Sequence, residues 1–169
     1  AGWIKSQSLA SRNIFFGYNA SDENIDTLVE GIVANPDDHH FLVLEKGGEW
    51  IGTLHIAKFG ENDVEFGFML DEHYRGQGYG DRLMDEGLTW ARNRGYGEVF
   101  LHCVASNKPV QFLCRKHGLE ITTEHGESET KAKLPRPDFY SITKEVTVRQ
   151  RQAWRIMLQK AFPLLEALD

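Results

Sequence analysis

Between residues 65 and 81 the sequence reads Glu65-Phe66-Gly67-Phe68-Met69-Leu70-Asp71-Glu72-His73-Tyr74-Arg75-Gly76-Gln77-Gly78-Tyr79-Gly80-Asp81. It begins in a β-rich run that ends at Leu70, and it passes through a glycine-dense loop into apolar residues at helical spacing. We therefore predict a strand, a loop and a helix in this order. Such a turn leaves several backbone N–H groups unpaired at the positive end of a helix dipole, where a phosphate is the natural ligand.

The spacing of the glycines excludes two common phosphate-binding motifs. A dinucleotide fingerprint needs Gly-x-Gly-x-x-Gly, but the last position is Asp81 when counted from Gly76 and Leu83 when counted from Gly78. A nucleotide-triphosphate loop ends in Gly-Lys-Ser or Gly-Lys-Thr, and the sequence contains neither tripeptide. A tight turn without a ligand is the plain alternative, but three alternating glycines beside an arginine exceed what a turn requires.

Before this stretch, the pattern predicts a helix and an antiparallel meander. Apolar residues at helical spacing indicate a helix over 24–34, with Ser21 or Asp22 as its cap. Two β-rich runs flank Gly47-Gly48 and indicate a hairpin, and a third strand follows a polar turn. The predicted strands cover 41–45, 50–56 and 64–70.

After the stretch, helices and strands alternate. We predict a helix from about Asp81 to Arg94, a buried strand over 99–104, and a helix that Asn107 caps and that runs to Gly118. Two short strands are expected at 119–123 and 130–134. The tail carries Trp154, Met157, Leu158, Ala161, Phe162 and Leu165 at amphipathic spacing, interrupted at Pro163. We expect this apolar face to pack on the body, with a homodimer contact as the alternative.

Composition narrows the class of protein. The 169 residues, 41% hydrophobic and 26% charged, are typical of one soluble globular domain with a short appendage. The net charge of −6 argues against a general nucleic-acid binder. It divides into −10 over residues 1–130 (11 Lys and Arg against 21 Asp and Glu) and +4 over residues 131–169 (8 against 4). We interpret the basic tail as a solvated helix face rather than a nucleic-acid or membrane patch.

Cysteine usage and hydropathy suggest a cytoplasmic protein. Cys103 and Cys114 are the only cysteines, and neither a CxxC motif nor an early signal-like hydrophobic stretch is present. The apolar runs are far shorter than the roughly 18 residues that span a bilayer, so we expect no membrane role. No Cys/His cluster has metal-ligand spacing, so we expect no metal.

Two segments resemble the GNAT superfamily of N-acetyltransferases, in particular its protein-lysine acetyltransferase-like branch. The family's pyrophosphate loop reads Arg/Gln-x-x-Gly-x-Gly/Ala, and the six residues from Arg75 to Gly80 match it. A second match follows at the expected distance, in Val104-Ala105-Ser106-Asn107-Lys108-Pro109-Val110-Gln111-Phe112-Leu113-Cys114-Arg115-Lys116-His117-Gly118-Leu119. It is similar to the family's strand, its helix-starting Asn and its Leu-x-x-Lys-x-Gly-Phe close, with Leu119 in place of Phe. The resemblance covers roughly residues 9–135.

The resemblance implies the acyl-CoA N-acyltransferase fold, a mixed α/β architecture with a mostly antiparallel central sheet, flanking helices and two strands that splay apart. Acetyl-CoA would lie as co-substrate between the strands that end near Leu70 and Val104. Its pantetheine would pair with the strand edge, as an added strand does, and its pyrophosphate would lie over the glycine-rich turn. The implied cofactor-binding residues are Met69, Leu70, Asp71, Arg75, Gly76, Gln77, Gly78, Tyr79, Gly80, Asp81 and Asn107. A plain helix cap is the alternative role of Asn107.

The resemblance also implies a reaction, the transfer of an acetyl group to a primary amine by direct attack within a ternary complex. Glu65 lies ten residues before Arg75, on the strand where similar protein-lysine acetyltransferases place a catalytic Glu. The resemblance therefore implies Glu65 as the base that takes the ammonium proton, in a cleft wall beside Phe66 and Phe68, and a backbone N–H near Leu70 as the oxyanion donor. A surface carboxylate is the plain alternative for Glu65. Many relatives have a Tyr that protonates the departing thiolate at the position where this chain has Cys114. We expect Cys114 to be a core residue. The alternatives are that Cys114 serves weakly as the acid, that Tyr74 or Tyr79 substitutes, or that the thiolate leaves unaided.

The resemblance is weaker at both ends. The family begins with a strand and a helix, whereas residues 11–16 resemble its first inter-helix segment, so the first strand is expected to be absent, rearranged or supplied by a partner. We predict an acetyltransferase domain over 1–137 and a helical extension over 138–169. The acidic body favours a cationic acceptor, either a protein amine or a small polyamine-like or antibiotic-like molecule. The alternative function is a non-catalytic acetyl-CoA-binding module.

Overall fold

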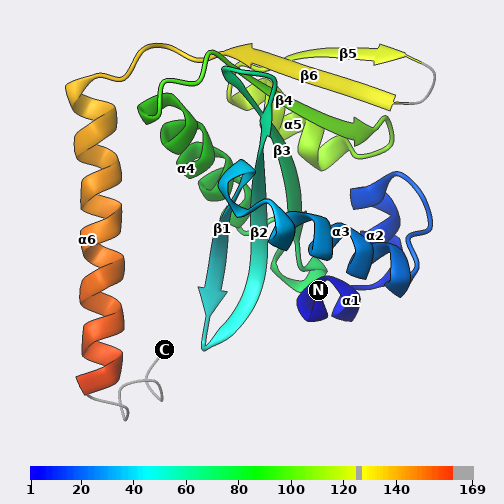
Figure 1. Ribbon diagram of the computed structural model, residues 1–169, viewed down its shortest axis with the longest axis horizontal. Coiled ribbons are helices and arrows are strands. Elements are labelled where there is room, and N and C mark those ends of the chain that lie inside the picture. The colour runs from blue at the N-terminus through cyan, green and yellow to red at the C-terminus, as the bar shows by residue number, and fades with distance from the viewer. Residues whose placement is uncertain (125–126, 162–169) are drawn as a thin grey trace.

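A computed structural model describes residues 1–124 and 127–161 as a sheet flanked by helices, with one long helix set apart from it (Figure 1). The α-helices are α1 (Gly2–Ser6), α2 (Leu9–Phe16), α3 (Asp22–Ala34), α4 (Tyr79–Asn93), α5 (Lys108–Lys116) and α6 (Phe139–Ala161). The strands are β1 (His39–Lys46), β2 (Glu49–Phe59), β3 (Asp63–Leu70), β4 (Glu98–Val104), β5 (Glu120–Glu124) and β6 (Glu127–Lys133). Two 3₁₀ turns, η1 (Pro36–Asp38) and η2 (Glu72–Tyr74), complete the order.

The six strands form one mixed sheet in the order β1-β2-β3-β4-β6-β5. The first three strands pair antiparallel, β3 and β4 are parallel, and β4, β6 and β5 again pair antiparallel. The predicted meander and the predicted fold class are therefore confirmed. The alternation after residue 78 also matches the prediction, although α4 starts two residues earlier and β6 three residues earlier than the sequence pattern suggested.

Local sequence explains several element ends. Gly47 and Gly48 both have positive φ, at 58° and 81°, as the tight turn of a two-residue hairpin between β1 and β2 requires. Ser21 caps α3 through a reciprocal capping box with Asn24. Such a cap contributes about 1 kcal/mol to helix stability, because it satisfies N–H groups that the helix leaves free.

The parallel pair β3–β4 is very short. Its register joins only Val64 to Val99 and Glu65 to Phe100 within the described residues. Beyond these two pairs the strands diverge, so the remainder of β3 faces β4 without strand pairing. We call this opening the splay; it lies between residues 66–70 of β3 and 101–104 of β4.

The two faces of the sheet carry different helices at the splay. Even-numbered residues of β3 point toward α4, where Phe66 is buried against the close approach of Gly87. Odd-numbered residues point to the opposite face, where the ring of Phe15 on α2 lies against Gly67. The far end of α2 reaches β4, because Gly17 lies close to Val104. Helix α2 therefore spans the splay on the face opposite α4.

The core lies between the sheet and the helices α4 and α5. Its fully buried side chains include Leu54, Ile56, Val64, Phe66, Leu83, Met84, Val99, Leu101 and Cys114. Complete burial of one such large apolar side chain stabilises the fold by about 1.5–3 kcal/mol. This core holds β3 and β4 together at their point of divergence.

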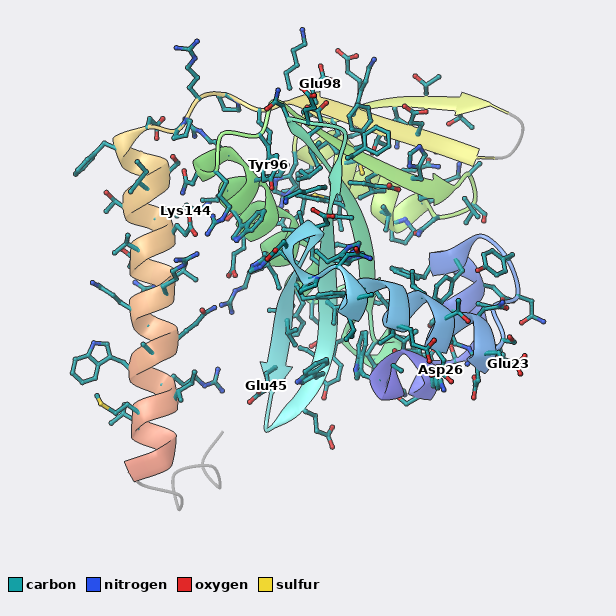
Figure 2. All side chains as sticks on the ribbon, viewed as in Figure 1. Glu23, Asp26, Glu45, Tyr96, Glu98 and Lys144 are labelled. Atoms are coloured by element: carbon teal, nitrogen blue, oxygen red, sulfur yellow. The ribbon has the colours of Figure 1, made fainter. Side chains whose placement is uncertain are left out.

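Helix α6 corrects one expectation. It meets α4 through ion pairs, with Lys144 Nζ 2.6 Å from Asp85 and Arg94 3.0 Å from Glu145 (Figure 2). Its charged side faces the body, whereas Trp154 and Met157 are 62% and 50% exposed. The predicted packing of the apolar face on the body is therefore wrong for the described residues. The predicted interruption at Pro163 lies outside them.

The N-terminal segment also differs from expectation. Residues 11–16, predicted to lie between helices, form most of α2, which Ser8 caps by accepting from the N–H of Ser11. Residues 1–38 contain helices and turns but no strand, so the sheet begins with β1. Across the described ranges, no helix combines the length and apolar character needed to cross a membrane.

Candidate functional site

The edge of β3 that faces the splay offers backbone hydrogen-bonding groups. The N–H of Asp71 donates to the Ile51 carbonyl at 2.9 Å, so the alternation of an antiparallel ladder directs Met69 toward β2 as well. The N–H and C=O of Phe68 and Leu70 consequently point to the other side, where β4 has already diverged. Of the predicted edge residues Met69, Leu70 and Asp71, only Leu70 thus has a backbone that faces the splay.

The glycine-rich turn follows directly and leads into α4. Gly76 and Gly78 have φ of 73° and 84°, a region that other residues rarely adopt, and a Cβ at either position would meet open space. Gly78 is the N-cap of α4 and no side chain caps this helix. The first N–H groups of α4, including those of Tyr79 and Gly80, therefore have no side-chain acceptor, which suits an anion.

Gly80 has a packing role in addition to its place in the motif. A Cβ there would lie 3.1 Å from Leu113 of α5 and 3.4 Å from Phe68 of β3. Glycine at this position lets α4 begin close to the splay. The alternating glycines therefore have two roles. Gly76 and Gly78 provide the positive-φ backbone of the turn, and Gly80 allows the close approach of α4 to Leu113 and Phe68.

Arg75 does not project freely from the turn. Its Nε and Nη2 both donate to the Leu70 carbonyl at 3.1 Å, and Nη2 also donates to the Ser11 hydroxyl at 2.7 Å. These bonds join the turn to the end of β3 and to α2. They also occupy the Leu70 carbonyl and leave the Leu70 N–H as the donor that faces the splay.

Gln77 and Asp81 are also held in place. Gln77 Nε2 donates to the His73 carbonyl at 2.8 Å. The Asp81 carboxylate lies 2.8 Å from Lys116 Nζ and 2.9 Å from His117 Nε2, and hydrogen bonding to these two groups holds the pKa of Asp81 below its usual range. Because Lys116 compensates its charge, Asp81 is compatible with a second anion at the start of α4.

Asn107 and Cys114 both have structural roles in α5. Asn107 accepts from the N–H of Val110 at 3.3 Å and therefore caps α5. Cys114 is fully buried, its Sγ lies 3.8 Å from the Thr130 hydroxyl, and burial raises the pKa of its thiol to about 11. A buried thiol of this kind is a core residue, as expected.

The side chains of Tyr74 and Tyr79, near the turn, lie against the β1–β2 hairpin. The rings of Tyr74 and Tyr79 contact each other edge to face, with centroids 6.0 Å apart. Lys46 at the end of β1 lies over both rings, at 5.6 and 5.9 Å from their centroids. Both rings are thus in contact with the β1–β2 hairpin.

Glu65 lies on the face of the sheet opposite Phe66 and Phe68, so the expected shared cleft wall is wrong. Strand alternation causes this separation. Its Oε1 is instead 3.0 Å from Nδ1 of His102 on β4. Both side chains are partly exposed, at 40% for Glu65 and 48% for His102. The pair stands at the point where β3 and β4 begin to diverge.

The structure therefore brings most of the predicted residues to the splay and the turn beside it. Two further groups at the splay, His102 and the backbone of Phe68, were not predicted from the sequence. Phe100, His102 and Val104 alternate along β4, which predicts that they share one face of the sheet. The sequence does not show which β3 residue lies next to His102, because that depends on the register of the parallel pair. Among the described residues, no group of three or more His, Cys, Asp and Glu side chains is arranged to hold a metal ion.

Comparisons with known proteins agree with this geometry. The acetyltransferase (GNAT) family model matches residues 9–119, which is more than half of the chain. The matched range includes the splay, the glycine-rich turn and both helices beside them. The sequence matches none of the curated proteins with which it was compared.

Solved structures share the fold at low sequence identity. Ribosomal-protein-alanine N-acetyltransferase from Brucella melitensis is 19% identical, with 79% of this chain and 93% of that one covered and a TM-score of 0.61. The PaiA N-acetyltransferase from Thermoplasma acidophilum, solved with coenzyme A, is 19% identical over 78% and 90%, with a TM-score of 0.61. Spermidine N-acetyltransferase from Vibrio cholerae, solved with CoA and spermine, is 12% identical over 79% and 90%, with a TM-score of 0.64. The chain belongs to the GNAT family and is an acyl-CoA-dependent acetyltransferase.

Proposed function

We propose that the protein transfers the acetyl group of acetyl-CoA to a primary amine within a ternary complex. The observation that carries this proposal is the continuity between an unpaired strand edge and an uncapped helix start. The edge of β3 is free of strand pairing beyond Glu65, and the turn after Leu70 opens α4 with no side-chain cap. A molecule with an amide-containing arm and a diphosphate matches these two features in this order.

The residues at the splay fit acetyl-CoA. The backbone of Phe68 and the N–H of Leu70 would hold the pantetheine arm, and residues 76–81 would hold the diphosphate. Acetyl-CoA supplies an acetyl thioester, whose carbonyl carbon accepts the amine. Asn107, whose amide oxygen caps α5 after the end of β4, is the residue that we assign to the pantetheine on the β4 side of the splay. Met69 and Asp71 contribute by fixing β3 to β2.

Glu65 is the carboxylate that we assign to amine deprotonation. It lies on the α2 face, opposite the α4 face from which the diphosphate would approach, so the amine and the cofactor would enter from different sides. An ammonium group must lose a proton before its nitrogen is a nucleophile. A backbone N–H of β3 at Phe68 or Leu70 would donate to the thioester oxygen as negative charge develops there.

A cationic amine is the acceptor class that we propose. Residues 1–130 carry a net charge of −10, and on the α2 face Glu65 lies at the inner end of the splay with Glu129 beyond it on β6. Acidic surroundings attract an ammonium group before it is deprotonated. The acceptor is then a protein lysine, a protein N-terminus or a small cationic amine. The spermine complex of the Vibrio cholerae relative is consistent with this class.

A screen of amines with acetyl-CoA tests the function directly. Purified protein is mixed with acetyl-CoA and, in turn, with polyamines, aminoglycoside-like amines and lysine-containing peptides, and the released thiol is measured. We expect amine-dependent thiol release with at least one cationic class. Binding of acetyl-CoA without turnover in any class would contradict the proposal.

Location and assembly remain predictions. Cys103 and Cys114 are free thiols, which suits the reducing cytoplasm that we propose for the reaction. A homodimer stays a prediction, and light scattering separates a 19.3 kDa monomer from a species of twice that mass.

A further inference from the structure

His102 is placed between two carboxylates on the α2 face of the sheet. Its Nδ1 lies 3.0 Å from Oε1 of Glu65 on β3, and its Nε2 lies 3.7 Å from Oε2 of Glu129 on β6. His102 and Glu129 are direct partners in the β4–β6 register. The three side chains therefore form a row across three neighbouring strands.

The row leads away from the splay. Glu65 belongs to the last residue pair that joins β3 to β4, so its carboxylate stands at the inner end of the opening. His102 follows on β4, and Glu129 lies beyond it on β6, with its side chain 56% exposed. A proton that moves along this row passes from the reaction site to solvent.

The chemistry of the groups favours that direction. Imidazole is a stronger base than a carboxylate, so the ring of His102 is a suitable acceptor for a proton that Glu65 has taken up. A carboxylate beside the ring stabilises the imidazolium that results. In this row a carboxylate stands on each side of the ring. A base that keeps its proton blocks the next turnover, and a neighbouring acceptor removes this block.

We propose that Glu65, His102 and Glu129 form a proton relay in which His102 takes from Glu65 the proton that the amine has lost. The inference rests on the proposed function. Each step conserves charge and atoms. The ammonium N–H bond breaks and a Glu65 O–H bond forms. The proton then moves to Nδ1 of His102, and the proton on Nε2 passes to water beside Glu129. Proton exchange with solvent returns the ring to the tautomer that carries its proton on Nε2 and is ready for the next turnover. No oxidant or further reactant is required.

Replacement of His102 with chemical rescue tests the relay. We expect His102→Ala to lower kcat/KM about 10- to 100-fold at pH 7, with acetyl-CoA affinity and melting temperature close to those of the wild type. Added imidazole should restore part of the lost rate to His102→Ala and leave the wild type unchanged, which a merely structural role would not produce. The loss should also shrink as pH rises, because hydroxide then removes the proton from Glu65 directly. Glu129→Gln should cause a smaller loss.

A second histidine variant serves as the control, and each contrary outcome has its own meaning. His40, which stacks on Trp90 with ring centroids 4.4 Å apart, provides a histidine outside the site, and His40→Gln should keep the wild-type pH profile. An active His102→Ala enzyme with the wild-type rate and pH profile would overturn the relay and leave the proposed function intact. A loss that imidazole does not rescue at any pH would also overturn the relay. A wild-type protein that acetylates no amine would overturn both.

Discussion

Nη2 of Arg75 donates to the hydroxyl oxygen of Ser11 over 2.7 Å, and this bond joins the glycine-rich turn to helix α2. The same guanidinium holds the Leu70 carbonyl, so one side chain fixes the turn, the end of β3 and the helix that spans the splay. Ser11 is only 3% exposed, so its hydroxyl depends on protein partners. These bonds therefore fix the glycine-rich turn and α2 relative to each other.

Arg75→Lys should weaken this arrangement. An ammonium group cannot reproduce the planar fork that reaches two acceptors, so we expect a loss of about 1–2 kcal/mol in the free energy of unfolding and a several-fold higher KM for acetyl-CoA. Arg82→Lys is the matched control, since Arg82 is 57% exposed and forms an i,i+4 pair with Glu86. Its effect should stay within about 0.5 kcal/mol in urea unfolding. Equal effects of the two replacements would contradict the role of Arg75.

Gly78→Ala tests the anion-binding turn. Gly78 and Gly48 both have strongly positive φ, at 84° and 81°, and both face open space where a Cβ would stand. Alanine should therefore cost each position a similar strain of about 1 kcal/mol. Only Gly78 lies at the start of α4, so only Gly78→Ala should raise the acetyl-CoA Kd, by about tenfold, in calorimetric titrations. If Gly48→Ala weakens binding as much, the turn is not the diphosphate site.

Gly87 and Gly31 predict opposite effects of the same replacement in a helix. A Cβ at Gly87 would collide with Leu54 and would lie 3.2 Å from Phe66, so Gly87→Ala should destabilise the fold by about 1–3 kcal/mol. Gly31 in α3 has no atom within 4 Å of that position, so Gly31→Ala should stabilise by about 0.5–1 kcal/mol. Chemical unfolding measures both changes, and a stabilising Gly87→Ala would show that α4 is farther from the sheet.

His55 makes stability depend on pH. Burial, with a smaller contribution from His39, lowers the pKa of His55 to about 4, and the ring stacks on Phe41. Between this value and the ordinary value near 6.5, the unfolded chain binds the proton more strongly, so stability falls as pH drops from about 6.5 to 4. Because solvent still reaches the ring, we expect only about 1 kcal/mol. Thermal unfolding should show a smaller pH dependence for His55→Gln; an unchanged dependence would assign the effect elsewhere.

Local signals in the sequence were sufficient for most elements. Gly47-Gly48 fixed the hairpin, Asn107 the start of α5 and Ser21 the start of α3, because each acts through its own backbone. Helix α2 was missed because its eight residues are too few to show a clear helical period. The placement of α6 was missed because amphipathic spacing says which residues share a face, while ion pairs with α4 decide where that face points.

The same distinction between local and long-range features applies to the site. The motif located the turn and the strand before it, since these residues are consecutive. The contacts of Arg75 with Ser11 and of His102 with Glu65 join residues 64 and 37 positions apart, so they depend on tertiary register. The position of Phe66 and Phe68 relative to Glu65 was within reach of the sequence, because strand alternation alone places them on opposite faces.

Replacement of Glu65 by Gln, measured for turnover and binding together, tests the central claim most directly. Glu49→Gln, at an exposed carboxylate in the β1–β2 hairpin, is the matched control. The account predicts that Glu65→Gln lowers amine-dependent thiol release by about 100-fold or more at pH 7, while the acetyl-CoA Kd stays within about twofold of the wild type. Undiminished thiol release by Glu65→Gln would contradict it.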